Sequence, residues 1–148
     1  MVVSDRASTF GSFFLGGFEC SSHWRSDGRR LDLLASTQHD RLAAMDYELL
    51  ARHGIRAVRD GLRRHLIEKR PGYYDWSSFP PMLRTSEAVG KRVIWDLCHY
   101  GYPDDLDIWS TAFIDRFARF ASAAAQLIKE KSRHVPVYCP VNEMSFWA

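Results

Sequence analysis

The sequence predicts an α/β fold, the N-terminal half of a (β/α)8 TIM barrel with four parallel strands and intervening helices. Short runs of β-branched and apolar residues alternate with longer segments whose apolar residues recur every three or four positions. Each run also ends in polar or ionisable residues, and parallel α/β folds carry their functional groups at that end. An open doubly wound sheet is the competing architecture. No GxGxxG or GxxxxGKS/T motif follows any run, so the barrel is the better fit.

Four strands are predicted, at residues 12–19, 55–59, 92–100 and 135–141. The third run, RVIWDLCHY, is the clearest. The last two runs do not alternate strictly between polar and apolar residues, which is typical of strands covered on both faces. The polar residues at the four strand ends are, in order, Glu19, Arg59 with Asp60, His99, and Asn142 with Glu143.

Three helices are predicted between these strands, at residues 37–54, 71–90 and 110–132, the second of them after a turn. Gly54 and Gly90 are the last residues of the first two segments, as expected of residues that end a helix. The third helix carries a stripe of apolar side chains at helical spacing, which we expect to face the core.

Composition narrows the possible functions of the chain. A length of 148 residues, 46% of them hydrophobic, indicates one globular domain. A net charge of +2 gives no reason to expect nucleic acid or an anionic membrane as partner. Three cysteines without CxxC spacing argue against a disulfide framework or a zinc ribbon, and we expect no metal and no cofactor. The N-terminus lacks the pattern of a signal peptide, and no segment is apolar enough for a membrane span, so a cytoplasmic location is expected.

Four segments in this order and at this spacing resemble the first half of a clan A glycoside hydrolase. The likeness is nearest to the β-glucosidase/β-galactosidase group of family one, and it extends over roughly residues 13–148. The segments are GIRAVR (54–59), PGYYDWSSF (71–79), HYGYP (99–103) and VNE (141–143). The resemblance implies a (β/α)8 barrel that hydrolyses β-linked sugars with retention and without a cofactor.

The resemblance assigns catalytic roles to two residues. Glu143 is expected to be the acid/base, partly desolvated by Phe146 and Trp147, and Arg59 is expected to orient a nucleophile. From local sequence alone, Glu143 could equally cap a loop, and Arg59 could pair with its neighbour Asp60.

Substrate binding is expected from Asn142, His99, Glu19 and Trp147. Asn142 and His99 match the family pattern. The alternatives are a turn residue for Asn142 and a hydrogen-bonded core histidine for His99. Glu19 is expected to contact sugar hydroxyls or to pair with Arg59. Trp24 and Trp109 are further candidates for sugar stacking.

The sequence also departs from the family. ECSSHW (19–24) stands where a sugar-binding Gln is usual, and Met144 replaces the usual Pro after Asn-Glu.

A full barrel needs about 250 residues, and the family nucleophile lies on the seventh strand. Residues 1–148 are therefore expected to form one truncated catalytic-domain fragment, inactive alone, that self-associates or pairs with a complementing half-barrel. Within the chain, Glu19 and Asp60 are the candidates for a second catalytic carboxylate near Glu143, although neither matches the family nucleophile. The alternative function is a non-catalytic carbohydrate-binding or half-barrel assembly module.

Overall fold

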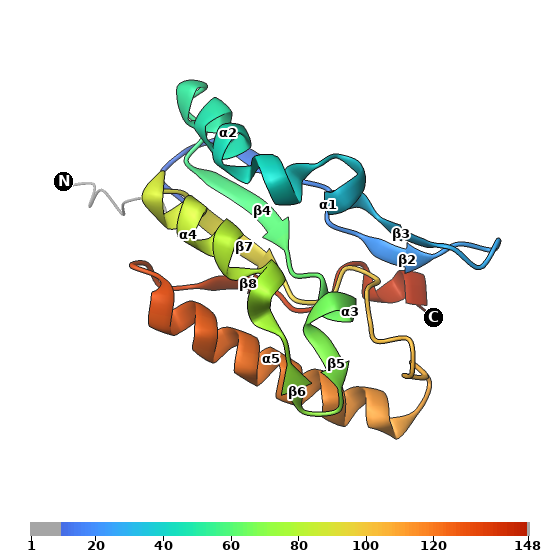
Figure 1. The fold of residues 1–148 in the computed structure, drawn as a ribbon. Helices are drawn as coiled ribbons and strands as arrows, with labels where there is room; N and C mark the ends of the chain where they lie inside the picture. Colours follow the sequence, from blue (N-terminus) through green and yellow to red (C-terminus); the bar gives the residue numbers. More distant parts are fainter. Residues whose placement is uncertain (1–9, 148) are drawn as a thin grey trace, which may run out of the picture.

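The structure, a computed structural model, describes residues 10–147 and every side chain of that range except that of Trp147. Its centre is a four-stranded sheet in the order β1 (Leu15–Gly17), β4 (Ala57–Gly61), β7 (Arg92–Asp96) and β8 (Val137–Cys139) (Figure 1). All three pairings are parallel. The strands follow one another in sequence order, whereas a doubly wound sheet reverses its order at a switch point. The predicted half-barrel is thus confirmed.

Three long helices connect the four strands and pack on one side of the sheet (Figure 1). They are α2 (His39–Arg52), α4 (Pro80–Ala88) and α5 (Thr111–Lys131). α2 and α5 lie within two residues of the predicted bounds, whereas α4 begins only at Pro80, well after the start of the predicted segment 71–90. Gly54 and Gly90 follow α2 and α4 with φ of 72° and 68°, a left-handed conformation that glycine adopts at little cost. The core between helices and sheet contains Tyr47, Met82, Leu83, Phe120 and Ile128 from the helices, and Val58, Val93 and Trp95 from the strands.

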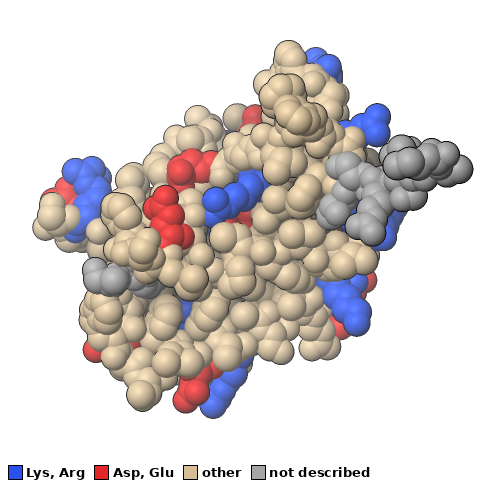
Figure 2. Space-filling model, turned by 180° about the vertical axis from the view of Figure 1, so that it is seen from behind, with Lys and Arg blue, Asp and Glu red and all other residues tan. Residues whose placement is uncertain are grey.

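The opposite side of the sheet is the face that lines the inside of a barrel. Because successive strand residues point to opposite faces, Val58 and Trp95 turn toward the helices while Arg59, Asp96 and Cys139 turn inward. The register supports this: Trp95 is paired with Tyr138, and Asp96 with Cys139. The molecule seen from behind is covered mainly by residues other than Lys, Arg, Asp and Glu (Figure 2).

Several short elements were not predicted, because segments of two to four residues carry too little periodicity to be recognised. Two antiparallel hairpins extend from the sheet, and each turns at a glycine with positive φ, Gly28 and Gly72. The short elements are β2 (Ser22–Trp24), β3 (Arg30–Asp32), α1 (Leu33–Ser36), α3 (Arg64–Ile67), β5 (Glu68–Arg70), β6 (Tyr73–Tyr74) and the 3-10 helices η1 (Trp76–Ser78) and η2 (Met144–Trp147).

The strand ends differ from the prediction in ways that matter for the site. β7 stops at Asp96, so His99 lies in the loop after the strand. β4 extends through Gly61, which places Asp60 inside a strand. Among the helices of residues 10–147, none combines the length and the apolar character that crossing a bilayer requires.

Candidate active site

The C-terminal ends of β4 and β7 are joined by a two-pronged ion pair. Arg59 donates from Nε to Asp96 Oδ2 at 2.8 Å and from Nη2 to Asp96 Oδ1 at 2.9 Å. Asp96 is fully buried. Burial alone would raise the pKa of Asp96, but hydrogen bonds from His99, Arg59 and Cys139 outweigh it and hold this pKa below its usual range. The hydrogen bond to Asp96 likewise raises the pKa of Arg59. The pair is therefore charged and fixed in orientation.

Asp60 does not belong to this site, so the alternative pairing of Arg59 with Asp60 is wrong. The two are neighbours on β4 and point to opposite faces. Asp60 Oδ2 accepts a hydrogen bond from Tyr47 Oη at 2.5 Å and lies 2.9 Å from His39 Nε2. Tyr47 and His39 both belong to α2, on the helix side of the sheet. Asp60 is fully buried there and cannot serve as a second carboxylate for a ligand on the inner face.

Asn142 follows β8 and meets Arg59 directly. Its Oδ1 accepts from Arg59 Nη2 at 2.5 Å, and its backbone N–H donates to the carbonyl of Cys98 at 2.9 Å. Its Nδ2 lies 3.3 Å from Tyr100 Oη. Asn142 is buried, so each of these bonds helps to fix its amide. The side-chain amide of Asn142 is thus oriented by Arg59 on β4 and by Tyr100 in the loop after β7.

Glu143 comes next and accepts a hydrogen bond from Tyr100 Oη. Burial and the neighbouring carboxylate of Glu143 raise the pKa of Tyr100, which keeps the phenol a donor. The expected desolvation of Glu143 by Phe146 is wrong. Glu143 is exposed, and Phe146 is itself 80% exposed, so its ring does not enclose the carboxylate. The Phe146 ring lies beside that of Tyr100, with 6.3 Å between the centroids. The side chain of Trp147, expected on the same wall, lies outside the described residues.

Tyr100 and Glu143 share an unusual backbone conformation, with φ of 62° and 44°. For residues with a Cβ, such left-handed conformations cost about 1–3 kcal/mol each. The surrounding hydrogen bonds of Asn142 and Tyr100 hold the two residues in place. The backbone therefore presents the phenol and the carboxylate to each other at a local cost in stability.

His99, Glu19 and Cys20 form the remaining side of the site. His99 Nδ1 lies 3.3 Å from Asp96 Oδ2 and 3.1 Å from Cys20 Sγ, and its Nε2 lies 3.5 Å from Glu19 Oε1. Glu19 therefore neighbours His99, and its Oε1 also accepts from the backbone N–H of Ser21 at 2.9 Å. Because Cys20, Asp96 and His99 each offer an atom of a metal-binding type, they are also the group that could hold an ion.

A cleft with a volume of about 450 Å³ opens beside Tyr100. This volume lies in the usual range of small-ligand sites. Trp24 and Trp109, expected as stacking residues, are 45% and 73% exposed in its walls. The cleft is lined by His23, Trp24, Tyr100, Tyr102, Ile108, Trp109 and Phe146.

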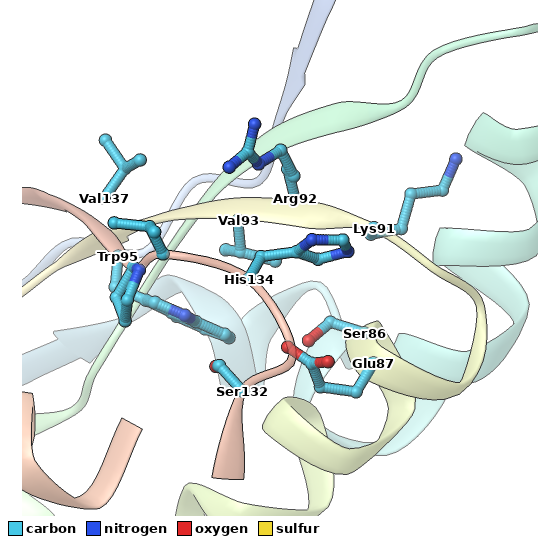
Figure 3. Close-up of a pocket in the computed structure, with 11 residues that line it drawn as sticks. Ser86, Glu87, Lys91, Arg92, Val93, Trp95, Ser132, His134 and Val137 are labelled. Carbon is cyan, nitrogen blue, oxygen red and sulfur yellow. The ribbon is translucent and has the colours of Figure 1, made fainter. Parts of the chain in front are cut away.

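A second, much smaller cavity lies at the other end of the sheet, near the start of β7 and β8. Figure 3 shows Glu87, Ser132 and His134 among the residues around it. Its volume of about 20 Å³ has room for one water molecule. The cavity is too small for a sugar and lies away from the polar strand ends, so it does not compete as a functional site.

Three residues of the site were missed by the sequence prediction: Cys20, Asp96 and Tyr100. Asp96 left a signal, because an acid within the apolar run VIWDLC needs a charged partner once the strand is buried. Tyr100 stands next to a predicted residue but is identified only by its bond to Glu143. Cys20 gave no signal, since its partners lie 76 and 79 positions away.

Solved glycosidase structures share this fold. An exo-β-1,4-mannosidase from Opitutaceae bacterium strain TAV5 superimposes over 89% of the chain, with a TM-score of 0.67 and 19% identity. A β-glucosidase from rice covers 86%, with a TM-score of 0.64 and 16% identity. A family 1 β-glucosidase from Thermotoga maritima covers 68%, with a TM-score of 0.57 and 15% identity.

The chain spans a quarter of the mannosidase, 33% of the rice enzyme and 24% of the Thermotoga enzyme. No protein-family model matches the sequence, and neither does any curated protein. At identities below 20% the likeness establishes the fold, the first half of a glycosidase-like barrel.

Proposed function

We propose that the chain forms the acid/base half of the active site of a retaining β-glycosidase. The observation that carries this proposal is the linkage of Arg59, Asn142, Tyr100 and Glu143 across three consecutive strand ends. Glycosidases with the same half-barrel fold are known, and barrel enzymes hold their catalytic groups at this end.

The acid/base role falls to Glu143. In retaining hydrolysis one carboxyl group protonates the leaving oxygen and later takes a proton from water, while a second, about 5–5.5 Å away, attacks the sugar. Glu143 is open to a substrate and is positioned by Tyr100. By the family resemblance, the second carboxylate comes from a seventh strand. The 148 residues alone are then inactive.

Arg59 is proposed to orient that second carboxylate. It donates through Nε and Nη2 to Asp96 and Asn142, which fixes the plane of the guanidinium. A fixed guanidinium binds a carboxylate with less loss of side-chain freedom than a mobile one does.

Substrate contacts are proposed for Asn142, His99, Glu19 and Trp147, with a β-linked sugar as the ligand. Asn142 and His99 face the inner side of the sheet, and Glu19 is 52% exposed beside His99. The cleft with Trp24 and Trp109 suits the part of the substrate that lies farther from Glu143, because sugar rings stack on aromatic faces through their apolar C–H groups.

The second candidate is a non-catalytic carbohydrate-binding module. The aromatic cleft favours it, since a cleft large enough for a small ligand is lined by residues of this chain. Both candidates predict that methyl β-glucoside or methyl β-mannoside binds the isolated chain. The contribution of Glu143 to that binding separates them.

The test is an NMR titration of the folded chain with both methyl glycosides, together with an assay for hydrolysis of aryl β-glycosides. An acid/base acts mainly in the transition state, so Glu143→Gln should change the affinity less than about 3-fold. In a binding module the same change should weaken binding about 10-fold, the loss of one charged hydrogen bond. Asn142→Ala should weaken binding in both cases, and Gln126→Ala, on the exposed side of α5, serves as the control. A folded chain that binds neither glycoside would contradict both candidates.

A further inference from the structure

Three side-chain atoms near the site form an almost equilateral triangle. Cys20 Sγ lies 3.1 Å from His99 Nδ1 and 3.4 Å from Asp96 Oδ2, and the last two atoms are 3.3 Å apart. The residues come from the segment after β1, the end of β7 and the loop after β7. Cys20 is 2% exposed, the side chain of His99 is 12% exposed, and Asp96 is fully buried.

These spacings match one face of a zinc coordination tetrahedron. With Zn–S near 2.3 Å and Zn–N and Zn–O near 2.0–2.1 Å, tetrahedral geometry separates neighbouring ligand atoms by about 3.3–3.6 Å. An ion above the centre of the observed triangle reaches all three atoms at roughly 2.0–2.3 Å with shifts of a few tenths of an ångström. We propose that Cys20, Asp96 and His99 form a zinc-binding site.

The types of donor atom support Zn²⁺ over other cations. A thiolate, an imidazole and a carboxylate are the three side-chain groups that bind zinc, whereas Ca²⁺ and Mg²⁺ prefer sites made of oxygen atoms alone. Three protein ligands leave a fourth position for water, as in zinc sites that are open to a ligand. The sequence prediction of no metal rested on the lack of CxxC spacing. Here the fold brings the ligands together across 79 positions of the chain, from Cys20 to His99.

The surroundings supply the second layer of contacts that zinc ligands usually have. Nε2 of His99, the nitrogen turned away from the triangle, lies 3.5 Å from Glu19 Oε1, as in carboxylate–histidine–zinc arrangements. Arg59 fixes the Asp96 carboxylate through both of its oxygens. These partners orient two of the three ligands before any ion arrives.

Gly61 provides the room for the sulfur. A Cβ at this position would lie 2.4 Å from Cys20 Sγ, closer than any side chain can approach. Without an ion, Cys20 donates its S–H hydrogen bond to Asp96. Binding of Zn²⁺ replaces that proton, which leaves to solvent as the Zn–S bond forms.

Cobalt(II) substitution in the reduced, metal-free full chain tests the proposal. We expect one equivalent of Co²⁺ to bind and to give a thiolate-to-cobalt charge-transfer band, and Zn²⁺ to displace it. Cys20→Ser should abolish the band and weaken Zn²⁺ binding on the order of 100-fold, the loss of a direct ligand. The chain offers a matched control in Cys98, a buried thiol that donates to the carbonyl of Gly101, so Cys98→Ser should keep the band.

Two further measurements keep the outcome clear if Cys20→Ser folds poorly. Circular dichroism reports the fold of each variant, and Zn²⁺ should raise the melting temperature of the unmodified chain. Glu19→Gln, which alters no ligand, should weaken Zn²⁺ binding about 10-fold. The proposal is overturned if the folded chain binds no stoichiometric Co²⁺. It is overturned equally if the band survives Cys20→Ser or disappears in Cys98→Ser.

Discussion

At the scale of single residues, Asp96 organises the site. Its carboxylate contacts Arg59 from β4, Cys20 and His99, and these contacts hold three segments in register. The sequence predicted that Arg59 and Asn142 lie near the ends of two strands, and the structure brings the two into direct contact. It could not predict that the partner of Arg59 is Asp96, because that depends on the pairing register of β4 with β7.

Removing Arg59 should therefore be costly. Arg59→Leu leaves the buried Asp96 without its counter-charge, and we expect the free energy of unfolding to fall by about 3–5 kcal/mol. Urea denaturation measures this value. Arg52→Ala, which breaks an exposed pair with Glu48, is the control and should change it by less than about 1 kcal/mol. Equal effects of the two substitutions would contradict a structural role of the Arg59–Asp96 pair, in which only the carboxylate is fully buried.

At the scale of elements, the long periodic segments were predicted well and the short ones were missed. α5 buries Phe120 and Ala124 of its apolar stripe, as predicted, because a stripe along several turns can bury only one face. α2 lies at the predicted place, but its spaced apolar residues Leu42, Met45 and Leu49 are exposed, and it packs through His39, Ala43 and Tyr47. The β2–β3 and β5–β6 hairpins depend on turns of a few residues and carry no such pattern. The same packing joins α2 to β4 through His39, whose ring nitrogens lie 2.6 Å from Asp46 and 2.9 Å from Asp60.

Contacts of His39 with two carboxylates should make stability depend on pH. Burial alone would lower the pKa of His39, but the hydrogen bonds and charges of Asp60 and Asp46 outweigh it and raise this pKa in the folded chain. A raised pKa stabilises the fold at pH below the unfolded value of about 6.5, and this contribution is lost as pH rises through the folded value. Urea denaturation from pH 6 to 9 should show the decline. His39→Gln should remove that decline, and a decline of the same size in the variant would show that another group causes it.

The docking of α5 should depend on Phe120. Its ring is fully buried and stacks on Trp76 with 5.9 Å between the centroids. Phe120→Ala should lower the free energy of unfolding by about 3–5 kcal/mol through the cavity it leaves. Ile114→Ala on the same helix removes a side chain that is 68% exposed, and we expect a change within about 0.5 kcal/mol. Thermal and urea denaturation of both variants test the difference.

At the scale of the whole molecule, the sheet formed by residues 10–147 has two edge strands, β1 and β8, each paired on one side only. Unpaired edges and a weakly charged inner face favour pairing with another chain. The order of the strands was predictable, because sequential β/α units have few ways to pack. The sequence could not predict what covers the two sheet edges, because that depends on surfaces that form only when the sheet folds.

We therefore expect the isolated chain to self-associate. Size-exclusion chromatography with light scattering should show species larger than a monomer, increasing with concentration. Leu15→Lys places a charge on the β1 edge, where Leu15 is 49% exposed, and should shift the distribution toward the monomer. A monomer with a sharp melting transition at every concentration would contradict this expectation.

The left-handed backbone at Tyr100 and Glu143 sets a limit on how robust this molecule can become. Substitutions that relax these two positions, such as glycine, would raise the melting temperature while removing the phenol and the carboxylate. Directed evolution for heat resistance alone would thus select against the two groups that the proposed function places in the active site. A screen that selects for both heat resistance and activity would have to select stabilising substitutions in the helices, away from the strand ends.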